Sequence, residues 1–310
     1  MIATESTQRR YLAERFGYRI VPHADHARLY HIVPSTAALA VFFASVRDVN
    51  AQRLAYVPYM RFVMAQRLEA ALGTGLLDDV RAIVRDRESG GFSIGLEGTT
   101  TDADDYVKFA TAVSYLLGPS NFDAMSGTFY ARFEVKHTDE SDSYLRQAYR
   151  TMTLHTDGTY VDEQTDWLLM MKFAEQHAVG GETRLLHLDD WDALREFSEH
   201  SLATHVFTYK SPPSKNVGFI MHRPTFFQVD GRPCISYIDQ FVYPETIAEG
   251  IYLDAMTESM EAASGTAAVP LPVGDLIVLN NIFWLHGRAA FQVDPQLHRE
   301  LLRQRGYFSP

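Results

Sequence analysis

Short strand-like runs recur along the chain after residue 129, and they constrain its fold more than any other feature. Each run is apolar or alternates between apolar and polar residues, a pattern typical of β-strands. The runs cover residues 129–135, 152–160, 167–173, 184–188, 234–238, 276–285 and 301–308. Chains with many short strands usually close as a barrel or as a jelly roll of two sheets. The pattern therefore predicts a β core whose inward-facing side chains can hold a ligand.

The first third of the chain is predicted to be mostly helical. Helices are expected from residue 34, with Ser35 or Thr36 as the N-cap, then over 59–72, over 76–87, and from about 101 to Gly118. Two more helices, starting at 189 and spanning about 244–263, are expected among the strands. Because no repeat or linker divides the chain, we predict one α+β domain over residues 1–310. It would be helix-rich over 1–118, with a jelly-roll core and inserted helices over about 129–310.

The composition narrows the classes of function. A hydrophobic content of 46% over 310 residues is that of a globular protein, and a net charge of −11 argues against nucleic acid as a partner. The single cysteine, Cys234, leaves no internal disulfide and no cysteine-bound metal. The first residues lack the apolar core of a signal peptide, and no run approaches the ~20 apolar residues of a membrane span. We expect a cytoplasmic protein that acts on small molecules.

His155 and Asp157 are two residues apart in a predicted strand, where alternate side chains point to one face. An imidazole and a carboxylate in this arrangement can bind one metal ion. His286, in a later predicted strand, could supply the third ligand of a facial triad for Fe(II). A short His-x-Asp pair is common by chance, so the spacing alone leaves a purely structural histidine as the alternative.

Arg303 and Arg305 are also two residues apart in a predicted strand, so both guanidinium groups are expected on one face. An exposed pair is the ordinary alternative. Apolar neighbours and a position soon after the strand that contains His286 instead favour a buried pair that binds carboxylates. Thr183, which follows Gly180 and Gly181, either belongs to an ordinary glycine turn or donates a hydrogen bond to a bound carboxylate.

Together these segments carry a family resemblance. His155-Thr156-Asp157 and residues 180–183, 280–288 and 303–308 resemble the clavaminate-synthase-like Fe(II)/2-oxoglutarate oxygenases. Longer stretches resemble the carbon-starvation-induced (CsiD) family of glutarate 2-hydroxylases, at residues 120–127, 141–147, 186–191, 212–217 and 237–242. The resemblance extends from about residue 106 to the C-terminal end of the chain. The N-terminal third is only loosely similar.

The resemblance implies a double-stranded β-helix in which His155, Asp157 and His286 bind Fe(II), with 2-oxoglutarate and O2 as cosubstrates. Arg305, assisted by Thr183, would bind the distal carboxylate of 2-oxoglutarate, and Arg303 would bind a carboxylate of glutarate. The implied reaction hydroxylates glutarate at C2 to L-2-hydroxyglutarate and releases succinate and CO2, without a separate acid or base residue. The resemblance also implies a homo-oligomer, such as a tetramer, with a role in lysine degradation.

Other functions remain open at this point. An oxygenase of the same fold could act on another small acid, such as a sulfonate or a betaine. A non-catalytic jelly roll could bind a dicarboxylate through Arg303 and Arg305 without any metal. Hydrolysis at a divalent metal is disfavoured because no further His or Glu near the triad suggests a base that activates water. His137, His187 and His222 are expected to be structural or to support the site from outside.

Overall fold

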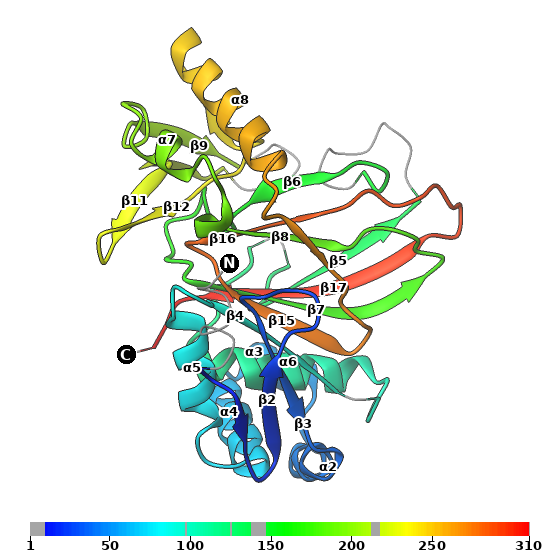
Figure 1. The fold of residues 1–310 in the computed structure, drawn as a ribbon. Coiled ribbons are helices and arrows are strands. Elements are labelled where there is room, and N and C mark those ends of the chain that lie inside the picture. The colour runs from blue at the N-terminus through cyan, green and yellow to red at the C-terminus, as the bar shows by residue number, and fades with distance from the viewer. Residues whose placement is uncertain (1–9, 97, 125, 138–146, 212–217, 310) are drawn as a thin grey trace.

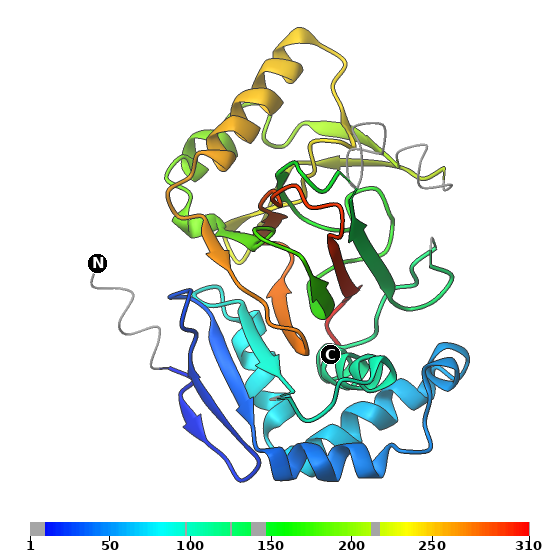
Figure 2. The same cartoon turned by 90° about the vertical axis from the view of Figure 1, so that its right-hand side faces the viewer.

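The computed structural model describes residues 10–96, 98–124, 126–137, 147–211 and 218–309. A group of helices covers one face of a large sheet, and a smaller sheet faces the other side of it (Figure 1). A turn of the view separates these layers and places α8 on the side of the small sheet far from the helices (Figure 2). The predicted family-like stretches 141–146 and 212–217 lie outside the described residues.

The large sheet has eight strands and is antiparallel except where β3 pairs with β4. In spatial order its strands are β1 (Ala13–Glu14), β2 (Tyr18–Pro22), β3 (Tyr30–Pro34), β4 (Gly91–Gly95), β15 (Asp275–Asn280), β7 (Trp167–Gln176), β17 (His298–Gly306) and β5 (Ala131–Lys136). Because β7 lies between β15 and β17 and is covered on both sides, its first seven residues are all buried.

The small sheet contains four strands and completes the jelly roll. In spatial order these are β14 (Ala267–Val269), β8 (Thr183–His187), β16 (Trp284–Arg288) and β6 (Met152–His155). Between β8 and β14 the described residues form two further small sheets, two α-helices and the short 3-10 helix η1 (Leu188–Asp190). The sheets and α-helices are β9 (Val206–Lys210) with β10 (Ile220–Pro224) and β13 (Val242–Tyr243), the hairpin of β11 (Phe226–Val229) and β12 (Arg232–Ile235), α7 (Leu194–Ser198) and α8 (Ile247–Glu261).

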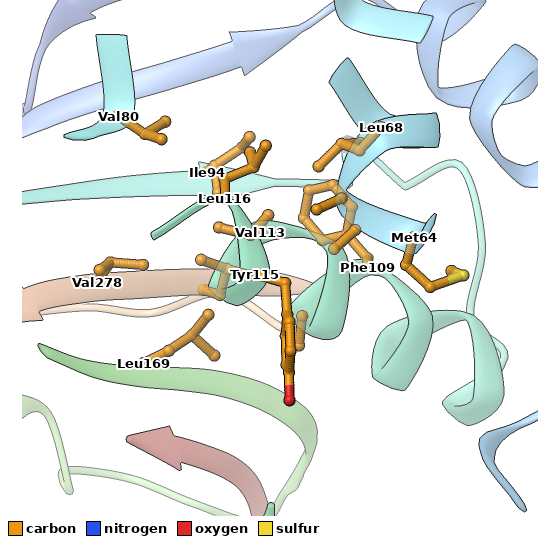
Figure 3. Packing of buried hydrophobic residues seen from close by; sticks show 14 of the residues in the cluster. Met64, Leu68, Val80, Ile94, Phe109, Val113, Tyr115, Leu116, Leu169 and Val278 are labelled. Atoms are coloured by element: carbon orange, nitrogen blue, oxygen red, sulfur yellow. The ribbon is translucent and has the colours of Figure 1, made fainter. Parts of the chain in front are cut away.

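The N-terminal helices pack against the outer face of the large sheet. They are α2 (Thr36–Ser45), α3 (Ala51–Tyr56), α4 (Tyr59–Leu72), α5 (Leu76–Arg85) and α6 (Ala103–Leu117). From Tyr106 onward every residue of α6 is buried, because α6 lies between α4 and the sheet. Phe109 and Val113 of α6, Leu68 of α4 and Leu169 of β7 point toward one another in this layer (Figure 3). No helix in the described ranges is both long and apolar enough to cross a membrane.

The fold matches the predicted jelly roll with flanking helices, and two of the differences from the prediction concern the large sheet. The chain before α2 is not helical: β1, β2 and β3 extend the large sheet. The predicted strand 276–285 is two strands, because the chain crosses from the large sheet to the small one between β15 and β16. Asn280 and Asn281 interrupt the apolar run at this crossing, and apolar residues resume at Ile282.

Candidate metal centre and its arginines

Two histidines from neighbouring strands of the small sheet meet inside the jelly roll. His155, the last residue of β6, pairs in register with His286 of β16. Their ring centroids are 4.2 Å apart, and both side chains are buried. His155 Nδ1 lies 2.8 Å from Thr153 O. Since a carbonyl oxygen only accepts, Nδ1 donates this hydrogen bond, and Nε2 is the ring nitrogen left to bind a metal.

Asp157 completes the cluster from the turn after β6, rather than from within the strand as predicted. Its backbone is fixed by Asn281: Asp157 N donates to Asn281 Oδ1 at 2.9 Å, and Asn281 Nδ2 donates to Asp157 O at 3.0 Å. One possible ligand atom from each of His155, Asp157 and His286 lies within 4.8 Å of the others. The described residues contain no other His, Cys, Asp or Glu group of this kind.

His286 and Asp157 have the protonation states that a divalent metal requires. Burial, followed by the proximity of His155, lowers the pKa of His286 to about 3, so its ring is neutral at pH 7. Burial alone would raise the pKa of Asp157, but Arg303 and other positive neighbours bring it below its usual range. Asp157 Oδ2 is buried and accepts no hydrogen bond from the described part of the chain. Two imidazoles and a carboxylate form the donor set of an Fe(II) facial triad.

Arg303 and Arg305 lie on the inner face of β17, beside the cluster. Arg303 Nη1 is 3.1 Å from Asp157 Oδ2, and Arg303 Nη2 donates to Asp123 Oδ2 at 2.9 Å. Arg305 is only 8% exposed, and burial, followed by the charge of Arg303, lowers its pKa. The Nε atoms of both arginines are buried and meet no acceptor among the described residues. Unpaired buried guanidinium donors of this kind favour binding of an anion.

A second group of buried cations, which the sequence did not predict, consists of Arg288, Arg299 and Lys172. Arg299 is 2% exposed, donates through Nη1 to Gly181 O, and has a buried Nε without a hydrogen-bond acceptor in the described residues. Burial, then the charge of Arg299, lowers the pKa of Arg288 to about 10. Lys172 Nζ donates to Glu175 Oε1 at 2.6 Å. We call this set the Arg288–Arg299 group.

The inward orientation of Arg288 and Arg299 could have been predicted from their spacing along β16 and β17. Arg288 follows the ligand His286 by two residues on β16, so the two side chains share a face. Arg299 precedes Arg303 by four residues on β17, which is also an even number. Arg288 and Arg299 are thus an even number of residues from His286 and Arg303, whose side chains are predicted to point into the core.

Thr183 lies at the Arg288–Arg299 group. In the pairing of β8 with β16, Thr183 is opposite Arg288, and the carbonyl that accepts from Arg299 belongs to Gly181, two residues earlier. Arg305 has different neighbours from Thr183: the charges that act on the pKa of Arg305 are those of Arg303, Asp157 and other groups around Arg303. The structure therefore places Thr183 and Arg305, predicted to share one carboxylate, beside different sets of cations.

The glycine turn before Thr183 has a structural role as well. Gly181 has φ +71°, and a Cβ atom there would overlap the ring of Phe291. We expect Gly181→Ala to lower the free energy of unfolding by about 2–4 kcal/mol, because a positive φ and overpacking add. Gly231→Ala is the matched control, since Gly231 has φ +73° with nothing within 4 Å of the added Cβ. Equal losses for the two variants in urea unfolding would contradict the packing argument.

The remaining histidines lie away from the metal cluster. His187 shares the His-x-Asp spacing through Asp189, yet its Nδ1 accepts from Asp189 N at 3.1 Å and its ring packs on Trp284. His137 Nδ1 lies 2.6 Å from Tyr149 Oη, and His222 is exposed on β10. The spacing alone thus occurs more than once, and the partner His286 distinguishes the pair at His155.

Solved structures of similar fold are non-heme iron oxygenases. OrfP in complex with Fe, succinate and (3R,4R)-dihydroxy-L-Arg superposes with a TM-score of 0.67 over 90% of this chain and 93% of that one, at 16% identity. Asparagine oxygenase in complex with Fe(II), 2S,3S-3-hydroxyasparagine and succinate gives a TM-score of 0.64 over 89% and 93%, at 14% identity. At such low identity, these likenesses establish the fold only.

Closer relatives are found by sequence. The glutarate 2-hydroxylase of Citrobacter koseri is 46% identical over 297 residues, which cover 94% of this chain and 91% of that protein. The glutarate 2-hydroxylase of Salmonella typhimurium LT2 is 45% identical over 303 residues, 96% and 93% of the two chains. The sequence model of the CsiD family matches residues 18–308, which include all three residues of the metal cluster and every arginine beside it. This chain belongs to the CsiD family.

Proposed function

We propose that this protein is an Fe(II)/2-oxoglutarate-dependent dioxygenase that hydroxylates glutarate at C2, forming L-2-hydroxyglutarate, succinate and CO2. The observation that carries the proposal is the buried cluster of His155, Asp157 and His286, with Arg303 and Arg305 beside it. The identity of 46% to a glutarate 2-hydroxylase supports glutarate as the substrate. We also propose a cytoplasmic homo-oligomer with a role in lysine degradation, as the family resemblance implies.

The metal would be held by two imidazoles and one carboxylate, which leave coordination positions for a chelating cosubstrate and O2. When bound, Fe(II) with 2-oxoglutarate and O2 supplies the oxidant that hydroxylates an unactivated carbon. Glutarate has no keto oxygen, so it cannot chelate the metal as 2-oxoglutarate does. The protein must therefore hold glutarate through its carboxylates, which need cationic partners because an unpaired buried charge is costly.

Arg303 and Arg305 suit the two ends of glutarate. Alternate residues on a strand are about 6.6 Å apart. The carboxyl carbons of an extended five-carbon dicarboxylate are about 5 Å apart by ordinary bond lengths. The backbone spacing of Arg303 and Arg305 is therefore similar to the length of this substrate. Their two charges match its two carboxylates, and each has a buried Nε without an acceptor among the described residues. We assign Arg303 to the carboxylate nearer C2, because it lies 3.1 Å from the predicted metal ligand Asp157.

The Arg288–Arg299 group is then available to bind the distal carboxylate of 2-oxoglutarate. Arg288 is two residues from His286 on the same strand face, so this group is about 6.6 Å along β16 from the metal cluster. Thr183 is opposite Arg288 and adds a hydroxyl donor. We propose that Arg299 and Thr183 bind the distal carboxylate. Binding of this carboxylate by Arg305, as the sequence predicts, is the alternative that the substitutions argued in the Discussion distinguish.

Product identification tests the proposed reaction directly. After incubation of the protein with Fe(II), 2-oxoglutarate, O2 and glutarate, mass spectrometry should find L-2-hydroxyglutarate and succinate in nearly equal amounts. Other small acids, including a sulfonate and a betaine, should stimulate succinate release far less than glutarate. If another acid stimulated succinate release more strongly than glutarate, that acid and not glutarate would be the substrate. Glutarate binding without metal and without any product would instead indicate a non-catalytic binding protein.

A further inference from the structure

Arg303 is held between two carboxylates from opposite sides of the site. Its Nη1 is 3.1 Å from Asp157 Oδ2, and its Nη2 donates to Asp123 Oδ2 at 2.9 Å. Each carboxylate therefore contacts one terminal nitrogen of Arg303, and neither forms the bidentate contact that an arginine and a carboxylate prefer. Arg303 Nε remains buried without an acceptor among the described residues. The guanidinium is fixed at both ends, with its Nε edge left for another ligand.

Asp123 is rigidly placed for this contact. Asp123 Oδ1 accepts from Ser126 N at 3.0 Å, and Asp123 N donates to Thr128 O at 2.7 Å. Two residues earlier, Asn121 N donates to Arg305 O at 2.7 Å, which ties this segment to the backbone of β17. Asp123 is 8% exposed; burial acts to raise its pKa, but Arg303, the hydrogen bond from Ser126 and Arg305 together lower it below its usual value. Asp123 is therefore an ionised carboxylate in a fixed position.

We propose that Asp123 is a positioning residue, which orients Arg303 so that its free Nε edge faces the carboxylate of the substrate. This inference rests on the proposed function, because it assumes that Arg303 binds glutarate. Without Asp123, Arg303 would be free to turn both terminal nitrogens toward Asp157 and form the bidentate contact there. The donors would then be directed at the metal ligand instead of at the substrate.

The opposite effect is also physically reasonable and makes the proposal testable. If Asp123 only competed with glutarate for Arg303, its removal would raise the local positive charge and tighten glutarate binding. If Asp123 only stabilised its own turn, replacing it by a residue that keeps the bond to Ser126 N would leave glutarate binding unchanged. Asn is that residue, because its single side-chain oxygen can accept from Ser126 while its NH2 group cannot accept from Arg303.

The test is isothermal titration of glutarate into the anaerobic Fe(II) and 2-oxoglutarate complex, in which binding is measured without turnover. We expect Asp123→Asn to weaken glutarate binding by at least about tenfold, as for loss of a charge-assisted hydrogen bond. The Kd for 2-oxoglutarate should change by less than about twofold, since its proposed anchor is the Arg288–Arg299 group. Asp123→Glu, which keeps the carboxylate, should recover part of the affinity lost in Asp123→Asn.

The controls separate this inference from the proposed function. Phe122→Ala, in the same segment, should bind glutarate like the wild type, because Phe122 is 59% exposed. Failure of the wild type to bind glutarate would refute the proposed substrate. If the wild type binds glutarate and Asp123→Asn binds it equally well or more tightly, the positioning role is wrong. Binding by Asp123→Glu that is as weak as by Asp123→Asn would also contradict it, since the carboxylate would then not be what matters.

Discussion

Replacing either Asp157 or His155 with alanine is expected to abolish iron-dependent succinate formation while leaving the protein folded. Each substitution removes one of the three predicted ligands, and two remaining side chains cannot hold Fe(II) in the facial arrangement. The turn should persist in Asp157→Ala because Asn281 binds the backbone N and O of residue 157, not its carboxylate. Within the described residues, the side chain of His155 makes a single hydrogen bond, to Thr153 O, so its loss should affect stability little.

Bound iron, far-UV circular dichroism and succinate release are to be measured on the same preparations. His222→Ala is a suitable control, because His222 is exposed on β10 and lies outside the metal cluster. It should retain iron, fold and turnover at wild-type levels. Iron-dependent turnover that survived in Asp157→Ala or His155→Ala would remove these residues from the ligand set and with them the facial triad.

Local sequence patterns predicted the elements with strong signals, and their bounds were correct to within a few residues. The helix predicted over 59–72 is α4, and the helix predicted to end at Gly118 is α6, which ends at Leu117 with Gly118 as its C-cap. The strands before α2 were missed because they are short and obtain their stability from remote partners. For example, β3 pairs with β4, although four helices separate these two strands along the chain. Such pairing leaves no periodic trace in the segment itself.

The site could be predicted where its residues follow a recognisable spacing along the sequence. The His-x-Asp pair, a later histidine and two alternating arginines were sufficient to propose the metal cluster and a carboxylate site. The bond between Arg303 and Asp123, and that between Asn281 and Asp157, join residues 180 and 124 positions apart, so no spacing rule could reveal them. The division of cations into two groups likewise depends on how the two sheets face each other.

Replacing Arg303 with alanine is expected to raise the KM for glutarate by about two orders of magnitude, with a much smaller effect on the KM for 2-oxoglutarate. Arg303 is the cation nearest the predicted metal ligand Asp157 and has a buried Nε free for a ligand. Its loss leaves one carboxylate of glutarate without a partner in a buried site, which is costly. Succinate release is to be measured at saturating Fe(II), because the substitution also removes a neighbour of Asp157.

Equal increases in the two KM values would contradict separate sites for the two acids. Arg299→Ala provides the reciprocal test: it should raise the KM for 2-oxoglutarate much more than that for glutarate, because Arg299 lies with Thr183 in the Arg288–Arg299 group. Arg305→Ala then decides between the two assignments. An effect mainly on glutarate would place Arg305 with Arg303 at the substrate. An effect mainly on 2-oxoglutarate would restore the sequence-based assignment, leaving the Arg288–Arg299 group without the role proposed here.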